Sequence, residues 1–272
     1  MQRYLDVSIE ERFYARLAGE PGVLVSVHAT GGSVPREVGA WMAVFGAEVL
    51  GTIGGGHVEL VAIAQARQRL AGVGGEPVLR YALGPSLGQC CGGEMFLRFE
   101  PVALADAPAL RLRLRPARQP VALFGGGHVG RALVQVLGML PMQVTWVDSR
   151  DGIFPPDVPP DVVCEHSDPV QAAVAQLAPH SSVLIMSFSH AEDLDVVAAC
   201  LLRQRQRGDL PFIGLIGSKT KWATFRRQLR ARGFEDAELD QVTSPIGLPG
   251  IAGKEPEVIA VSAAAQLLAL RA

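Results

Sequence analysis

Short apolar runs alternate with helical patterns along most of this chain. In its first part, one helical run extends from His57 to Leu70. Apolar runs with strand-like character occupy residues 23–29, 41–46, 48–54, 77–83 and 94–101. Runs of this length, bounded by glycine, proline and polar residues, are typical of β-strands. The pattern therefore predicts a small N-terminal α/β domain.

The pattern becomes more regular from Val121 onward. Further apolar runs occupy residues 121–124, 143–148, 161–165, 182–188 and 211–217, and helical patterns follow most of them. Such alternation is the signature of βαβ units on a buried parallel sheet. A last apolar stretch, residues 258–270, is expected to be a C-terminal packing helix. The second half is predicted to be a doubly wound parallel-sheet domain.

Residues 103–120 differ in composition from both halves. Leucine and arginine alternate from Leu110 to Arg115, which is compatible with an edge strand that has one basic face. Proline at both ends of the segment favours an interdomain connector instead. We therefore predict an N-terminal domain at 1–102, a linker at 103–120 and a C-terminal domain at 121–272, a division that suits 272 residues.

Charge and hydropathy exclude some partners. The formal net charge is −2 and the isoelectric point is near 6.3, so there is no basic excess for nucleic acid or anionic lipid. Residues 1–11 contain four charged side chains and no apolar run, which argues against a secretory signal. The stretch at 258–270 is shorter than the ~18 apolar residues of a membrane helix. We expect a cytoplasmic protein.

The pentapeptide Gly-Gly-Gly-His-Val occurs twice, at 54–58 and at 125–129. In the second copy Gly125, Gly127 and Gly130 have G-x-G-x-x-G spacing between a predicted strand and a predicted helix. Asp148 follows after ~20 residues, where dinucleotide-binding folds place a carboxylate on a ribose hydroxyl. This context predicts a dinucleotide-type turn, although folds keep such glycines for packing after the ligand is lost.

The first copy ends in Glu59 in place of the third glycine, so the fingerprint fails there. Two interpretations remain open. The turn is a simple strand-to-helix connection that His57 caps, or it presents the exposed side chains of His57 and Glu59 beside bare backbone amides.

The four cysteines are too few for a disulfide framework. Cys164 and Cys200 lie in apolar runs and are predicted to be small buried residues. Cys90 and Cys91 are adjacent and flanked by glycine, and successive side chains of an extended chain point to opposite faces, so at least one thiol should be accessible. The pair could bind a soft metal cofactor, act as a redox switch, or be structural; zinc is a weaker interpretation, since His57 is its one plausible companion ligand in this domain.

Several stretches together resemble the xanthine dehydrogenase accessory protein family (XdhC/CoxI), whose members bind molybdenum cofactor and assist its insertion into molybdenum hydroxylases. The matching segments cover nearly the whole chain in order: residues 31–44, 51–59, 88–95, 124–133, 147–155, 214–229 and 244–267.

The resemblance implies an N-terminal domain with the thiol motif and a C-terminal Rossmann-like domain. It implies molybdopterin as cofactor, an apo xanthine dehydrogenase or related molybdenum hydroxylase as partner, a cysteine desulfurase as a further partner, and a homo-oligomer. It also implies an assembly factor rather than an enzyme. The alternative is an NAD(P)-dependent oxidoreductase that uses Gly125–Gly130, and a redox sensor is a third hypothesis.

The resemblance gives the candidate residues their roles. Cys90 and Cys91 would contact the cofactor as molybdenum ligands. The pterin or its phosphate would lie near Ser33, Arg36, Gly54, Gly55, Gly56 and His57. A second anion-binding rim, with a nucleotide as one candidate ligand, would comprise Gly125, Gly126, Gly127, His128, Gly130, Asp148, Arg150, Ser218 and Lys219.

Overall fold

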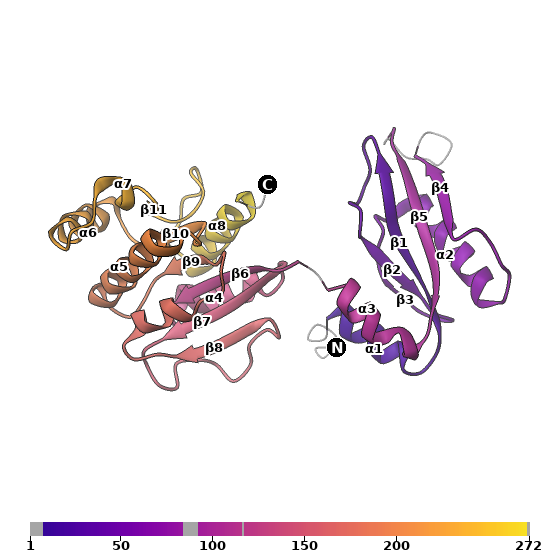
Figure 1. The fold of residues 1–272 in the computed structure, drawn as a ribbon, viewed down its shortest axis with the longest axis horizontal. Helices are drawn as coiled ribbons and strands as arrows, with labels where there is room; N and C mark the ends of the chain where they lie inside the picture. Colours follow the sequence, from indigo (N-terminus) through magenta and orange to yellow (C-terminus); the bar gives the residue numbers. More distant parts are fainter. Residues whose placement is uncertain (1–7, 84–91, 116, 271–272) are drawn as a thin grey trace. The chain divides into compact units, whose positions relative to one another are not determined.

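The chain forms two compact units, Met1–Arg115 and Pro116–Ala272 (Figure 1). The computed structural model describes residues 8–83, 92–115 and 117–270. The first unit contains α1 (Ile9–Leu17), β1 (Gly22–Gly31), β2 (Trp41–Val44), β3 (Val49–Gly51), α2 (Gly56–Leu70), β4 (Val78–Ala82), β5 (Glu94–Val102), the 3-10 helix η2 (Leu104–Asp106) and α3 (Ala107–Arg113).

The first unit is built on a five-stranded antiparallel sheet in the order β3-β2-β1-β5-β4. Side chains alternate across β1, since successive residues of a strand point to opposite faces. Val23, Val25 and Val27 are buried with residues of α2. Leu24 is buried in a second cluster with residues of α1 and α3. Both faces of this sheet therefore carry a hydrophobic core.

Most of the segment predicted to be a linker, residues 103–115, is largely helical and belongs to the first unit, and β6 of the second unit already begins at Gln119. Pro108 lies in the first turn of α3, where its missing N–H costs nothing. Leu110 is buried in the cluster that contains Phe13 and Val102, whereas Leu112 is exposed. The leucine–arginine alternation is thus part of a short helix with one buried position, so the structure does not support a linker over 103–120.

The second unit contains twelve elements in the described part of the chain. They are β6 (Gln119–Phe124), α4 (His128–Leu137), β7 (Met142–Asp148), β8 (Val162–His166), the 3-10 helix η3 (Val170–Gln176), β9 (Ser182–Ile185), α5 (His190–Arg207), β10 (Phe212–Leu215), α6 (Lys219–Ala231), α7 (Asp236–Leu239), β11 (Val242–Thr243) and α8 (Pro256–Ala269).

Its six strands are all parallel and have the order β11-β10-β9-β6-β7-β8. Chain order therefore reverses between β6 and β9, which is the arrangement of a Rossmann sheet. The predicted parallel-sheet domain is confirmed. The five predicted strands are all present. The sixth strand, β11, was not predicted, because two residues are too few to give a sequence pattern.

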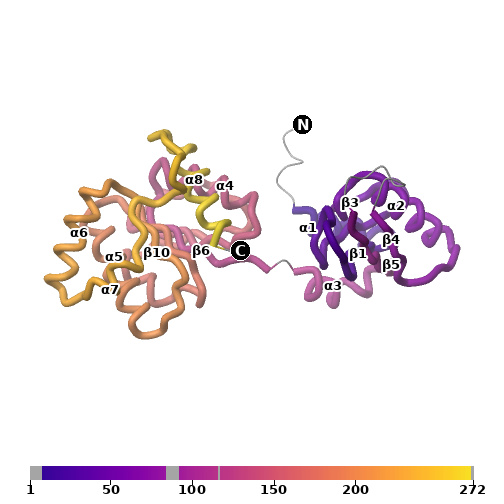
Figure 2. Tube along the Cα trace, turned by 90° about the horizontal axis from the view of Figure 1, so that it is seen from above, coloured from indigo at the N-terminus to yellow at the C-terminus, as the bar shows by residue number. Residues whose placement is uncertain are grey.

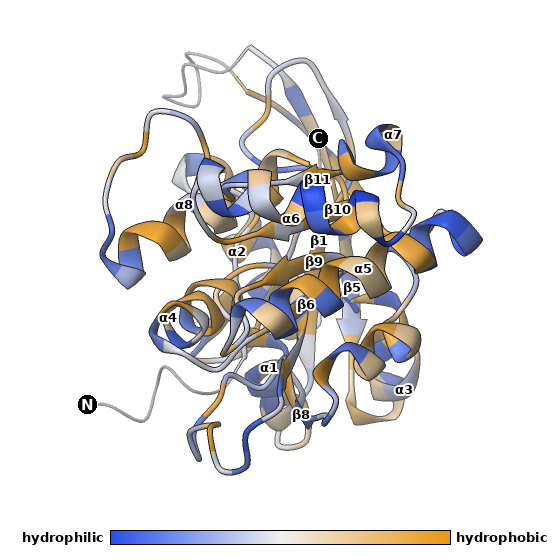
Figure 3. Ribbon diagram, turned by 90° about the vertical axis from the view of Figure 1, so that its left-hand side faces the viewer, coloured by the Kyte–Doolittle hydropathy of each residue, from blue (hydrophilic) through white to orange (hydrophobic). Residues whose placement is uncertain are grey.

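Helices cover both faces of the parallel sheet. On one face α4 and α8 lie side by side over β6, β7 and β9 (Figure 2). On the other face η3, α5, α6 and α7 share a buried cluster with the same sheet. In Figure 3 the central strands are coloured hydrophobic, whereas hydrophilic residues gather on α6 and α7. None of the described helices is long and apolar enough to cross a membrane.

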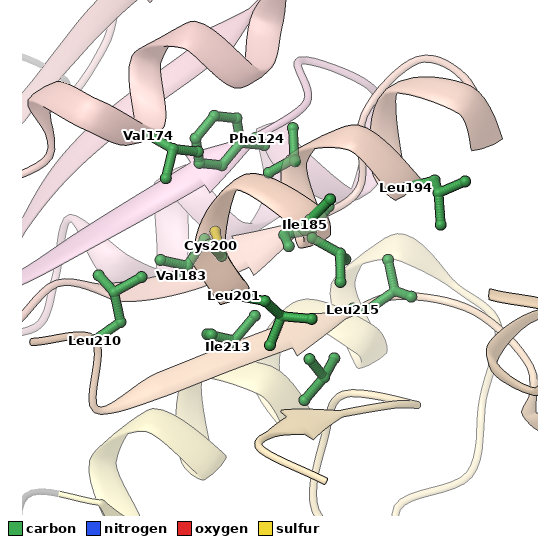
Figure 4. Close-up of a cluster of buried hydrophobic side chains, with 14 of the residues drawn as sticks. Phe124, Val174, Val183, Ile185, Leu194, Cys200, Leu201, Leu210, Ile213 and Leu215 are labelled. Atoms are coloured by element: carbon green, nitrogen blue, oxygen red, sulfur yellow. The ribbon is translucent and has the colours of Figure 1, made fainter. Parts of the chain in front are cut away.

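The two cysteines of this unit have different surroundings. Cys200 of α5 is fully buried among Val183, Leu201 and neighbouring apolar side chains, as predicted (Figure 4). The prediction for Cys164 is wrong, because its side chain is exposed. It belongs to β8, an edge strand of the sheet whose residues after Val162 are largely accessible.

Candidate functional site

The first glycine turn joins β3 to α2 and is held by a carboxylate of the same helix. Gly54–Gly56 all have positive φ angles, of 119°, 72° and 68°, which residues with a side chain rarely adopt. One oxygen of Glu59, Oε2, accepts hydrogen bonds from Thr52 Oγ1 at 2.5 Å, from Ile53 N at 2.9 Å and from Gly55 N at 3.0 Å. Glu59 thus fixes the turn in place of an external anion.

This geometry decides between the two interpretations of the first turn. His57 does not cap the helix, because the N-cap residue is Gly55, which makes no side-chain capping hydrogen bond. Glu59 is not free beside bare amides either, since it uses two of them. His57 is exposed. Both interpretations are therefore wrong in part: the imidazole is accessible, and the carboxylate is structural.

Three segments that are distant in sequence meet beside this turn. A Cβ added to Gly54 would lie 2.7 Å from Pro35 Cβ and 3.3 Å from Arg36 Cγ. A Cβ added to Gly93 would overlap the carbonyl oxygen of Ser33. The absence of side chains at these glycines lets the three backbones approach each other. Residues 31–36, 51–59 and 92–94 therefore form one corner of the first unit.

Ser33 and Arg36 bring polar groups to this corner. Ser33 is exposed. The Arg36 guanidinium donates to both carboxylate oxygens of its neighbour Glu37, at 3.4 and 3.3 Å. The pKa of Glu37 is lowered by a hydrogen bond from its own backbone amide and by Arg36. Because this pair is at the surface, its attraction is weak and a stronger anion could compete for the guanidinium.

Cys90 and Cys91 lie outside the described residues, so their predicted roles stay predictions. Gly92, which follows Cys91 in the chain, is described and exposed. Among the described residues, no group of three or more histidine, cysteine or acidic side chains is arranged to hold a metal ion.

The second glycine turn lies at the reversal point of the parallel sheet. Gly125 has a φ of 120°, and a Cβ there would overlap the carbonyl oxygen of Met186 at the end of β9. A Cβ on Gly130 would overlap the carbonyl oxygen of Gly125. Gly127 has open space around it. The first and third glycines are thus needed for close packing, and the second leaves the start of α4 accessible.

Asp148, at the end of β7, is buried and fully engaged by protein groups. Its Oδ2 accepts from Gly126 N at 2.6 Å and from Arg150 Nη2 at 2.9 Å. Its Oδ1 accepts from Arg150 N and Arg150 Nε, both at 2.9 Å. Burial raises the pKa of Asp148, but these hydrogen bonds together lower it by more, so the net shift of the pKa is downward. The carboxylate that would hold a ribose in a dinucleotide site is occupied here.

Both units match known sequences. Residues 121–267 match the XdhC Rossmann domain, and residues 15–82 match the XdhC and CoxI family. The chain belongs to the XdhC and CoxI family. The resemblance described from the sequence is therefore confirmed.

A curated relative and a solved structure are also similar to this XdhC-family chain. The uncharacterized protein YqeB of Escherichia coli K12 is 25% identical over 257 residues, which are 92% of this chain and 44% of that protein. This chain thus spans less than half of that curated relative. A crystal structure described as a xanthine dehydrogenase from Bacillus halodurans has a TM-score of 0.78, with 21% identity over 97% of this chain and 96% of the other, and supports the fold.

The structure brings together only some of the expected site residues of this XdhC-family protein. Gly125–Gly130, Asp148 and Arg150 adjoin each other through hydrogen bonds and close packing. Ser218 follows β10, which β9 separates from β6, and its hydroxyl accepts from Lys221 N as the N-cap of α6. Lys219 and His128 are exposed. The glycine turn and the start of α6 are therefore distinct parts of one sheet edge.

A buried ion pair at the same edge was not predicted from the sequence. Lys221 Nζ lies 2.5 Å from Asp193 Oδ2 and donates to the carbonyl oxygen of Ile216 at 2.9 Å. Asp193 Oδ1 also accepts from Ser187 N at 2.7 Å. The Lys221 side chain passes over Gly217, where a Cβ would lie 2.6 Å from its Cδ. The pair joins the loops after β9 and β10, and the Ser-x-x-Lys spacing after β10 was the available signal.

Proposed function

We propose that this protein is a maturation factor for a xanthine dehydrogenase or a related molybdenum hydroxylase, and that it holds molybdenum cofactor in its first unit. The supporting observation is the meeting of residues 31–36, 51–59 and 92–94 in a chain of the XdhC and CoxI family. The structurally similar protein from Bacillus halodurans bears the name of the proposed target enzyme, a xanthine dehydrogenase.

The residues of this corner fit an anionic, sulfur-bearing cofactor. Gly55 has open space around it, so a ligand can approach the backbone. The Arg36 guanidinium suits a phosphate, because its planar donors match phosphate oxygens. Ser33 and His57 add exposed polar groups. The bound cofactor would supply the molybdenum–dithiolene centre for which Cys90 or Cys91 is a suitable soft ligand.

The protein's own part in this proposal is to bind, shield and hand over the cofactor rather than to catalyse a hydride transfer. An apo molybdenum hydroxylase is the receiving partner, a cysteine desulfurase is a further partner, and self-association is part of the same proposal. The NAD(P)-dependent alternative is disfavoured by Asp148, whose oxygens are already bonded to Gly126 and Arg150. Calorimetric titration with NAD and NADP tests that alternative directly.

The proposal is tested with the variant Cys90→Ala/Cys91→Ala and the matched control Cys164→Ala, which removes an exposed thiol from the second unit. We expect the double variant to lose most bound molybdenum and pterin, measured by mass spectrometry of the purified protein. We also expect it to lose activation of the apo-enzyme, whereas Cys164→Ala keeps both. Wild-type cofactor content and activation in the double variant would refute the thiol role.

A further inference from the structure

Phe188 is an exposed aromatic side chain at the reversal point of the parallel sheet. It follows β9 by three residues and is 66% exposed. The backbone of Met186, two residues earlier, is in close contact with Gly125 of the glycine turn. Phe188 therefore stands beside the turn at the edge where ligands of open parallel sheets bind.

The Arg150 guanidinium lies over the ring of Phe188, with its carbon 4.6 Å from the ring centroid. The same guanidinium is fixed by Asp148, which also binds Gly126 of the glycine turn. A second contact joins the same two loops, because Ser149 Oγ donates to Glu192 Oε1 at 2.6 Å. The loops after β6, β7 and β9 thus meet in one network that ends in an aromatic ring and a cation.

This network changes what the sheet edge can recognise. Asp148 is saturated, so a ribose diol finds no acceptor on it without displacing Arg150. Nη1 of Arg150, in contrast, has no hydrogen-bond partner among the described residues, and the Arg150 side chain is 32% exposed. A guanidinium edge suits an anionic oxygen. An accessible aromatic ring suits a flat heterocycle, which stacks on it.

We propose that Phe188 and Arg150 form a binding subsite for a phosphate ester of a planar heterocycle, with the ring against Phe188 and the phosphate on Arg150. A nucleotide and a pterin phosphate share this chemistry. If the ligand is the pterin cofactor, the subsite is part of the proposed function and rests on it. A nucleotide ligand would be an addition to it.

The test is calorimetric titration of the full chain with three kinds of probe. They are cytidine and adenosine 5′-monophosphate, a 6-substituted pterin phosphate, and ribose 5-phosphate, which has the phosphate without the ring. Stacking of a base on an aromatic side chain contributes ~1–3 kcal/mol, so Phe188→Ala should weaken binding of a ring-bearing probe about 5- to 150-fold. Its effect on ribose 5-phosphate should be negligible.

Two controls make the result specific. Phe188→Trp keeps a stacking surface and should retain affinity, and Met139→Ala removes another exposed apolar side chain of the same unit, 79% exposed, without effect. Whichever ring-bearing probe binds more tightly identifies the source of the ligand. Absence of ring-dependent binding, or equal affinities in wild type and Phe188→Ala, overturns the proposal.

These titrations need no target enzyme and are repeated in the Cys90→Ala/Cys91→Ala variant. Nucleotide binding that persists there, while activation of the apo-enzyme is lost, supports the subsite independently of the thiol role. Normal activation without ring-dependent binding would overturn the subsite and leave the proposed function standing.

Discussion

Gly130→Ala should destabilise the second unit strongly, although it adds a single methyl group. The new Cβ would overlap the carbonyl oxygen of Gly125, a backbone atom that cannot rotate away. That oxygen also accepts the buried indole N–H of Trp146 at 3.0 Å. Helix α4 must therefore move away from the sheet, which costs ~1–3 kcal/mol for overpacking, and the strained or broken indole hydrogen bond adds ~1–3 kcal/mol.

We expect a loss of about 3 kcal/mol in the free energy of unfolding. The assay is urea unfolding followed by fluorescence of the buried Trp146, in a chain where Trp41 and Trp222 are replaced by phenylalanine. With a denaturant slope of ~2 kcal/mol per molar, the midpoint should fall by about 1.5 M. The matched control is Gly127→Ala, whose Cβ would contact nothing within 4 Å and whose φ of −71° is ordinary.

The control should lose about 1 kcal/mol or less, because alanine is a poorer N-cap residue than glycine. Equal stabilities of Gly130→Ala and the wild type would refute the packing role assigned to the third glycine. Equal destabilisation by both substitutions would show instead that the turn, rather than the helix–sheet contact, needs glycine.

Three further predictions concern side chains that the structure has placed. Glu59→Gln removes the charge that three donors share, so it should cost about 2 kcal/mol and speed hydrogen exchange of amides 52–60, measured by mass spectrometry. The pKa of Asp148 is lowered on folding, so its stabilising effect is present above its ordinary pKa of about 3.9 and is lost as pH falls below that value; Asp148→Asn should flatten the acid side of the stability profile. Iodoacetamide should label Cys164 in the native protein and Cys200 only after unfolding, because burial raises the pKa of the Cys200 thiol to about 12.

Each of these has a clear contrary result. Glu37→Gln, at an exposed position, is the control for the glutamate, and similar exchange in both variants would remove the special role of Glu59. An unchanged acid profile in Asp148→Asn would mean that its hydrogen bonds do not favour the charged form. Native labelling of Cys200 would contradict its place in the core.

The strands and the second glycine turn could be predicted because their signals are local. Apolar runs of the parallel sheet are continuous, since both of its faces are buried. Gly125, Gly127 and Gly130 are spaced along one strand–turn–helix unit, in which Gly130 packs against Gly125, although the contact of Gly125 with Met186 comes from another strand. Helix α1 also had a local signal that was not used. Ser8 and Glu11 form a capping box, with Glu11 N on Ser8 Oγ at 3.2 Å and Ser8 N on Glu11 Oε2 at 3.0 Å.

The remaining features depend on which segments the fold brings together. The exposure of Cys164 follows from the position of β8 at the edge of the sheet. A run of apolar residues does not indicate where its strand lies in the sheet. Lys221 reaches Asp193, 28 positions away in sequence, only because the first turns of α5 and α6 lie beside each other at the sheet edge. The structural role of Glu59 could not be predicted without knowing the path of the turn. The groups that donate hydrogen bonds to its carboxylate precede it by four to seven residues and do not lie in a helix.

The position of α3 also bears on how the chain folds during synthesis. The second core of the first unit joins Phe13, near the start of the chain, to Leu110, beyond the last strand of that sheet. Domains generally fold in order as they are made, but this one cannot close its second face until α3 has left the ribosome. Until then the part of this cluster that Leu110 covers would stay exposed, an apolar surface of the kind that a chaperone binds.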